Sequence, residues 1–203
     1  MAHYEIPLFP LNVVVFPLGV LPLRIFEARY LDMVRDCLRN KTPFAVVTTG
    51  TDNNADPLPF ASIGTVCNIA EVDVTEPGLM NIRCIGAKKM RVMSAAQQKN
   101  GLWIGQVEDY QPEPNMAIPE DLNLTQQYMQ QLIESLASQN IEAFAMPLQE
   151  PYQLDDCGWI ANRWTEILNI PLIEKQRMLA LDSPLVRLEL VQDYLTQSFG
   201  VTH

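Results

Sequence analysis

The sequence predicts an α+β protein in which a β-rich N-terminal part with one helix precedes an all-helical part. Three observations predict this order. The first thirty residues are an apolar run broken by four prolines, which excludes a long helix there. Residues 63–110 alternate polar and apolar side chains between turn signals, as strands do. Beyond a proline-marked junction at residues 112–119, the apolar period becomes helical.

The N-terminal block favours short extended pieces joined by bends. Each proline fixes φ and removes a backbone donor, so neither a helix nor an ordinary central strand fits. The apolar side chains of this block are too many to be buried easily, and we expect some of them to form an exposed patch. We expect Phe16 and Leu18, on either side of Pro17, to be exposed. The four prolines are Pro7, Pro10, Pro17 and Pro22.

Residues 27–40 predict the helix of the N-terminal part. From Tyr30 onward the apolar residues follow the i, i+3, i+4, i+7 rule, and charged residues fall on the other faces. We therefore expect one side of this helix to pack on the sheet. Residues 43–48 then predict a buried strand, and residues 50–59 a polar loop.

The next stretch predicts antiparallel strands. Residues 63–74 alternate with period two, and residues 76–78 are a turn signal before a second strand. Gly86 and the change of phase at residues 87–88 predict a bulge or a bend after that strand, and a further strand is expected through Met90 and Val92. A further turn at residues 99–101 leads into a last strand over residues 102–110.

The C-terminal part predicts about four helices. Residues 129–137 carry an apolar stripe, and Asp155 or Asp156 is placed to cap the helix that follows. Prolines in positions that suit a first turn begin the last two helices, over residues 172–181 and 185–199.

We place a domain boundary at the junction, with a β domain over residues 1–115 and a helical domain over residues 116–203. Residues 1–110 carry 10 Lys and Arg against 11 Asp and Glu, whereas residues 111–203 carry 4 against 13. Binding to a phosphate backbone needs clustered cations, so this balance disfavours a nucleic-acid partner. A cationic stripe nevertheless leaves RNA binding open, although we expect its two adjacent lysines, Lys88 and Lys89, to be solvated. The stripe is Arg83, Lys88, Lys89 and Arg91.

The sequence shows no membrane span and no export signal. Its longest apolar stretch is interrupted by prolines and is shorter than the ~20 residues that a span needs. The N-terminus has no basic region before its apolar block, and Glu5 stands where a signal peptide has Lys or Arg. We expect a cytoplasmic protein with no membrane partner.

We expect no catalytic site, no metal site and no cofactor. His3 and His203, the only histidines, lie at the two chain ends. Asp155 and Asp156 fit a helix start better than an acid/base pair. The cysteines have no CxxC spacing and are read as buried small apolar residues. They are Cys37, Cys67, Cys84 and Cys157.

The N-terminal block resembles the opening of the Lon protease N-terminal substrate-binding domain. That family has a Pro-Leu-aliphatic-Pro-Leu stretch, a hydrophobic run ending in Phe-Pro-Gly, and an extended segment that enters a helix. Residues 7–11, 13–19 and 22–26 match these parts, with Leu18 inserted between the proline and the glycine. Later positions that match in order are Ile63, Gly64, Cys67, Ile69, Gly86, Gly101, Val107, Glu108, Glu174, Lys175, Gln176, Leu179 and Asp182.

The resemblance implies a PUA-like β pseudo-barrel with one helix, followed by an all-helical bundle. It also implies a stand-alone bacterial Lon-like protein, because the sequence has no P-loop and no room for the ATPase and Ser-Lys protease domains. We therefore expect no enzyme activity.

The function that the resemblance implies is binding of unfolded or hydrophobic polypeptide segments, and a protease or chaperone partner is left open. Two alternatives also stay open. One is a small-molecule-binding or hydrolytic barrel, whose sign would be a polar pocket with a perturbed carboxylate. The other is an RNA-binding PUA-like domain. The residues expected to bind polypeptides are Phe9, Phe16, Pro17, Leu18, Val20 and Leu21.

Overall fold

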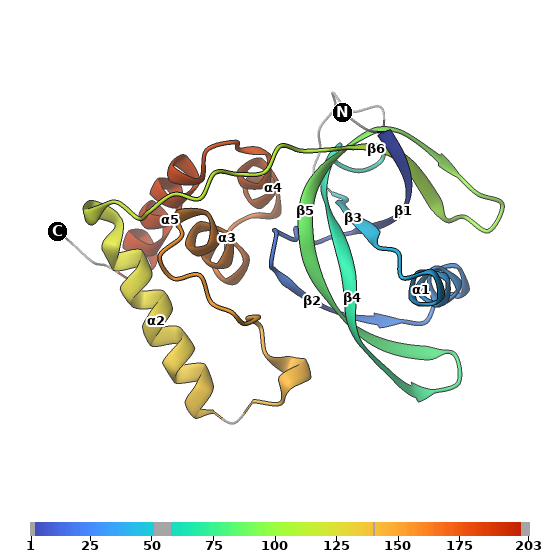
Figure 1. The fold of residues 1–203 in the computed structure, drawn as a ribbon, viewed down its shortest axis with the longest axis horizontal. Helices are drawn as coiled ribbons and strands as arrows, with labels where there is room; N and C mark the ends of the chain where they lie inside the picture. The colour runs from blue at the N-terminus through green and yellow to red at the C-terminus, as the bar shows by residue number, and fades with distance from the viewer. Residues whose placement is uncertain (1–2, 51–57, 140, 200–203) are drawn as a thin grey trace. The chain divides into compact units, whose positions relative to one another are not determined.

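The structure is a computed structural model that describes residues 3–50, 58–139 and 141–199 (Figure 1). Most of the polar loop predicted at residues 50–59 lies outside the described residues, as does His203. Within the described ranges, none of the helices is both long enough and apolar enough to cross a membrane.

The described chain divides into two compact units, with the division between Pro112 and Glu113. The boundary predicted from the sequence follows residue 115. In its described residues the first unit holds six strands and one α-helix, and the second holds four α-helices. The predicted α+β fold class is confirmed.

The strands of the first unit form one mixed, six-stranded sheet that curls back on itself (Figure 1). They are β1 (His3–Leu11), β2 (Val20–Ile25), β3 (Phe44–Thr48), β4 (Ile63–Glu76), β5 (Leu79–Gln97) and β6 (Trp103–Asp109). Their order is β2-β5-β4-β3-β1-β6. β5 also pairs with β6, so the last strand in this order is hydrogen-bonded to the second. Because β1 and β3 are parallel and β2 pairs with β5 alone among the described strands, the sheet is a pseudo-barrel and not a regular barrel.

β5 is one continuous strand where the sequence predicted two, and a bulge lies at the position where a bulge or a bend was expected. Val66 of β4 lies opposite Lys88, and the next β4 residue lies opposite Gly86. Ala87, between the two, is therefore the extra residue. A Cβ atom on Gly86 would lie 2.2 Å from a backbone carbonyl oxygen of the N-terminal block. Only glycine allows this close approach.

β1 is a single nine-residue strand despite its two prolines, whereas the sequence favoured shorter pieces. Residues 3–8 pair with β6, and residues 8–11 pair with β3. Pro7 and Pro10 therefore lie where β1 has only one partner strand. Each proline can be accommodated there because its missing N–H faces the side of β1 on which no strand is paired. The prolines restrict each half of the strand to one partner and do not end it.

The helix α1 (Ala28–Asn40) packs one face on the sheet, as its apolar stripe predicted. Tyr30 and Cys37 join residues of five strands in one buried core. The Phe9 ring of β1 stacks on the Tyr30 ring, with 3.9 Å between the ring centroids. Lys41 ends the helix in the left-handed conformation, with φ at 53°.

The second unit contains the four helices that the sequence predicted. They are α2 (Asn123–Ser138), α3 (Cys157–Ile167), α4 (Leu172–Ala180) and α5 (Pro184–Phe199). Asp156 caps α3, since its Oδ1 accepts the N–H of Trp159 at 2.7 Å. Ser183 does the same for α5, since its Oγ accepts the N–H of Val186 at 3.3 Å.

Candidate functional site

The structure divides the predicted polypeptide-binding residues between the core and the surface. Phe9, Phe16 and Leu21 are 6%, 0% and 8% exposed, so they are core residues. The predicted exposure of Phe16 is therefore wrong. Its carbonyl oxygen is the atom that lies against Gly86. The N-terminal block thus lies directly on the sheet, and the Phe16 ring is shielded from water.

Leu18 is the residue of the predicted site whose side chain is exposed, at 37%. It forms the tip of a tight turn, in which its N–H donates to the carbonyl of Gly86 at 2.8 Å and its φ is 62°. A leucine in the left-handed region costs of order 1 kcal/mol. The turn therefore holds an apolar side chain outward at a cost in stability. Pro17 and Val20 are half-buried beside it.

A second apolar surface, at the end of the β4–β5 hairpin, was not predicted from the sequence. Val72 and Val74 of β4 are 37% and 59% exposed, and Phe26, which follows β2, is 69% exposed. Val72 lies opposite the fully buried Ile82, so it continues the core-facing row of the sheet beyond the covered part. We call this the hairpin surface and define it as Leu23, Phe26, Val72, Val74 and Met80.

The base of the hairpin surface is fixed by the core. Leu23 lies opposite Ile82, and Met80 lies opposite Ile25. Both Leu23 and Met80 pack against the core while staying half-buried. Leu23 and Met80 therefore connect the exposed side chains of the hairpin surface to the core.

The helix α1 does not cover the end of the β4–β5 hairpin. α1 has 13 residues and β4 has 14, which correspond to about 20 Å of helix and about 46 Å of strand. One helix of this length leaves part of such a strand bare, and Figure 1 shows the β4–β5 hairpin extending past α1.

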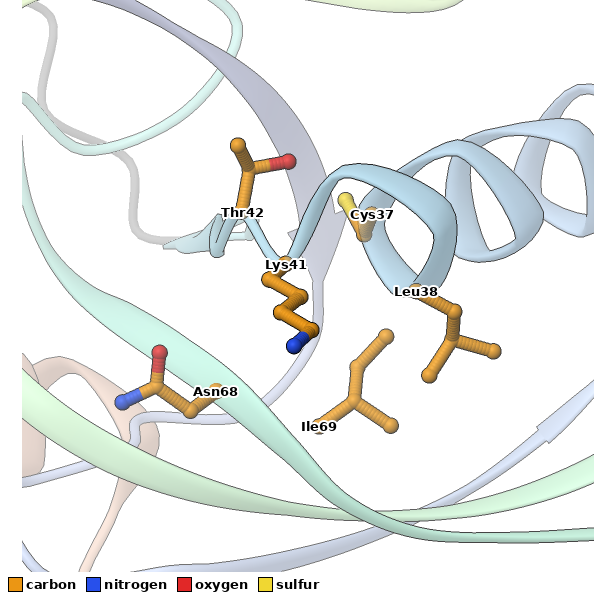
Figure 2. Close-up of a pocket in the computed structure, with 6 residues that line it drawn as sticks. All are labelled: Cys37, Leu38, Lys41, Thr42, Asn68 and Ile69. Carbon is orange, nitrogen blue, oxygen red and sulfur yellow. The ribbon is translucent and has the colours of Figure 1, made fainter.

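A pocket of about 240 Å³ opens between the end of α1 and β4 (Figure 2). Its lining is part apolar and part polar, with one cationic side chain and no carboxylate. It therefore lacks the perturbed carboxylate that would favour a hydrolytic barrel. The lining residues are Cys37, Leu38, Lys41, Thr42, Asn68 and Ile69.

Arg83 and Lys88, two of the four cations that kept RNA binding open, are paired with acidic side chains. Arg83 is buried and pairs with Glu71 at 3.3 Å. Lys88 pairs with Asp109 at 2.5 Å, and Asp109 also accepts the hydroxyl of Tyr4 at 2.7 Å. Partial burial by itself would raise the pKa of Asp109, but the hydrogen bonds from Lys88 and Tyr4 lower it overall.

Lys89 is 4% exposed, so the expectation that it is solvated is wrong. The bulge at Ala87 shifts the alternation of β5 by one residue, so Lys89 lies opposite the buried Thr65 and shares its face of the sheet. Its ammonium lies 5.0 Å from the ring centroid of Tyr110, and the Arg91 guanidinium lies 5.4 Å from the same ring. Cations engaged in this way argue against a phosphate-binding surface.

The other candidate groups have structural roles. Asp155 accepts the side-chain amide of Gln126 at 3.0 Å, while Asp156 caps α3, so the two carboxylates do not act as a pair. Burial raises the pKa of Cys84 to about 12 and that of Cys157 to about 11, so both thiols are protonated at neutral pH. Among the described residues, no cluster of His, Cys, Asp and Glu is placed to hold a metal ion.

Comparisons with known proteins agree on one family. A family model described as the ATP-dependent protease La (LON) substrate-binding domain matches residues 5–197. "Lon protease 2" of Myxococcus xanthus is 25% identical over 197 residues, and the Lon protease of Rhizobium meliloti (strain 1021) is 21% identical over 198 residues. The alignments cover 95% and 96% of this chain but 23% and 24% of those relatives. The chain therefore spans about a quarter of their length.

Solved structures show the same fold. The crystal structure of the Lon N-terminal domain protein from Xanthomonas campestris matches with a TM-score of 0.74 and 28% identity, over 94% of this chain and 98% of that one. The N-terminal domain of the Mycobacterium avium complex Lon protease matches with a TM-score of 0.62 and 14% identity, over 94% and 97%. At 14% identity the second match shows the fold alone.

Proposed function

This chain belongs to the family of the ATP-dependent protease La (Lon) substrate-binding domain, and we propose that it is a non-catalytic, cytoplasmic module that binds hydrophobic segments of unfolded polypeptides. The hairpin surface is the observation that carries the proposal. Phe26, Val72 and Val74 expose apolar side chains at one end of the sheet. An apolar surface of this kind marks a site of interaction with another molecule.

The hairpin surface suits polypeptides of varied sequence. Burial of apolar area contributes about 25 cal/mol per Å², and the effect has no preferred direction. It therefore demands no particular order of residues in the partner. Folded proteins keep most of their large apolar side chains inside, whereas unfolded chains expose them. Such a surface selects unfolded chains over folded ones.

Leu18 supplies a second contact in this proposal. It lies just before β2, and Phe26 lies just after it. The six residues of β2 span about 20 Å, a length that an extended segment of about six residues matches. Phe9, Phe16 and Leu21 support this surface from the core and do not contact the polypeptide.

The alternatives have weaker support. An RNA-binding surface would need free cations, and those of the predicted stripe contact acidic or aromatic side chains. A hydrolytic barrel would need a carboxylate in its pocket, and the pocket beside α1 has none in its lining. The curated relatives are named Lon proteases, and we propose that bound polypeptides pass to a partner protease or chaperone.

Fluorescence anisotropy of a labelled, permanently unfolded polypeptide tests the proposal. We expect the wild-type protein to bind this polypeptide and to leave a folded control protein unbound. The double variant Phe26→Ser/Val74→Ser should bind about tenfold more weakly, because it loses about 1.4 kcal/mol of apolar contact.

Met93→Ser is the matched control. The Met93 side chain is 53% exposed and lies on the part of β5 that pairs with β6, away from the hairpin. This variant should bind as the wild type does. Absence of wild-type binding, or equal affinities for all three proteins, would contradict the proposal.

A further inference from the structure

We propose that the pocket at the end of α1 binds the C-terminus of a polypeptide, with an apolar last side chain against Leu38 and Ile69 and the α-carboxylate at Lys41. The inference rests on the proposed function, because it names the part of a polypeptide that this domain would hold beside the hairpin surface. Three features support it: the charge of Lys41, the size and lining of the pocket, and its position on β4.

Lys41 presents a cation that has no partner in the part of the chain that the structure describes. Its backbone is left-handed, with φ at 53° and ψ at 43°, and its N–H donates to the Cys37 carbonyl as a helix cap. Glycine is the usual residue at this position because any side chain there is strained. Figure 2 shows the Lys41 side chain extending across the pocket toward Ile69 of β4.

The helix end itself does not account for this lysine. A helix C-terminus attracts cations, and Arg39 already occupies the last turn of α1. The Cys37 carbonyl oxygen accepts the N–H groups of both Lys41 and Thr42, the latter at 3.0 Å, so it is satisfied without an ammonium. The charge of Lys41 is therefore available to an anion in the pocket.

The pocket has the size and lining for one apolar side chain. Its volume of about 240 Å³ is below the roughly 300–1,000 Å³ of pockets for drug-sized ligands. Leu38 is 42% exposed and Ile69 is half-buried, and they supply apolar walls. Burial raises the pKa of the Cys37 thiol, so this group is neutral at pH 7 and does not repel an anion at Lys41.

The position of the pocket favours a chain end over a small acid. Ile69 lies opposite Cys84, and Val72 lies opposite Ile82. Cys84 and Ile82 both belong to the core on one face of the sheet, so Ile69 and Val72 share that face. A polypeptide with its last residue in the pocket would place preceding residues along β4 toward the hairpin surface. A free aliphatic acid would leave that surface empty.

A set of labelled peptides tests the inference by fluorescence anisotropy. One peptide ends in a leucine carboxylate, a second is the same peptide with a C-terminal amide, and N-acetyl-leucine serves as an unlabelled competitor. We expect the acid to bind about tenfold more tightly than the amide, as a charge-assisted hydrogen bond in a partly exposed site predicts. N-acetyl-leucine should compete only at much higher concentration.

Lys41→Gln should reduce the affinity for the acid to that for the amide. Lys99→Gln removes an exposed lysine from the β5–β6 turn and should leave the affinity unchanged. Equal binding of acid and amide, an unaffected Lys41→Gln variant, or competition by N-acetyl-leucine at the peptide's own concentration would each overturn the inference.

A long unfolded polypeptide with an amidated C-terminus separates this inference from the proposed function. If the wild type binds it while the acid peptide has no advantage over its amide, the proposed function stands and the C-terminal pocket is wrong. If the acid peptide binds through Lys41 while the amidated polypeptide does not bind, general recognition of unfolded chains is wrong and the pocket stands.

Discussion

Arg187 of α5 and Glu113 form a partly buried, bidentate ion pair, with Nη1–Oε2 at 2.9 Å and Nη2–Oε1 at 2.7 Å. Arg187 is 0% exposed. Its remaining N–H groups donate to the Asn162 side chain and to the carbonyls of Met178 and Leu181. All five donors of the guanidinium are therefore used. Arg187 therefore connects Glu113, the first residue of the second unit, to α3, α4 and α5.

Replacing Arg187 should destabilise the second unit strongly. Arg187→Met leaves the Glu113 carboxylate in a poorly hydrated site and three acceptors without their donor, so we expect a loss of about 3–5 kcal/mol in the free energy of unfolding. Urea denaturation followed by the fluorescence of Trp159 and Trp164 measures it. Arg177→Met, which breaks an exposed pair with Glu174, should cost less than about 1 kcal/mol. Similar losses in the two variants would contradict this account.

Gly86→Ala should destabilise the first unit. The new Cβ would lie 2.2 Å from the carbonyl oxygen of Phe16, so the N-terminal block has to move away from the sheet. We expect a loss of about 3 kcal/mol or more, as for other overpacked positions. Gly78→Ala is the control, because that glycine has a φ of 85° but nothing within 4 Å of a Cβ.

The control variant Gly78→Ala should lose only about 1 kcal/mol in the free energy of unfolding, through backbone strain. Thermal unfolding of both variants gives the comparison. The account of the close approach fails if Gly86→Ala is as stable as Gly78→Ala.

Lys41→Gly should separate stability from binding. Glycine relieves the left-handed strain at φ 53°, so we expect the free energy of unfolding to rise by up to about 1 kcal/mol. The same change removes the ammonium from the pocket, so the affinity for a peptide with a free C-terminal carboxylate should fall. An unchanged affinity for that peptide would show that Lys41 has no role in recognition, and a loss of stability would show that its side chain supports the helix end.

The buried thiols should resist alkylation in the folded protein. Burial raises the pKa of Cys84 from 9.0 to about 12, so little thiolate forms near pH 8. Because the raised value belongs to the folded state, this thiol contributes stability that is complete below pH 9 and is lost as the pH rises toward about 12. Iodoacetamide at pH 8, followed by mass spectrometry, should modify the urea-unfolded chain and leave Cys84 intact in the folded one. Rapid native modification of Cys84 would contradict its burial.

Local periodicity was enough to predict most of the fold. The α1 stripe, the β4–β5 turn and the cap of α3 each depend on residues close together in the sequence. A bulge or a bend at Ala87 was also predicted, because glycine and a change of phase mark it locally. β1 was longer than expected, because the effect of Pro7 and Pro10 depends on which strands lie beside them.

The candidate site was harder to predict because exposure depends on distant contacts. Phe16 is buried by its approach to Gly86, which lies far along the chain. Lys89 lies opposite the buried Thr65, in a register that the extra residue at Ala87 sets. Val72 continues an apolar alternation that usually marks the core, but it is 37% exposed because the contacts that would cover it depend on the tertiary arrangement.

Chemical-shift mapping tests the central claim most directly. The wild-type protein, labelled with ¹⁵N, is titrated with an unfolded polypeptide whose C-terminus is amidated. The account predicts that amide signals of the hairpin surface move first and furthest, with Val72, Val74 and Met80 among them. Shifts confined to the second unit or to the part of β5 that pairs with β6, or no shifts at all, would contradict it.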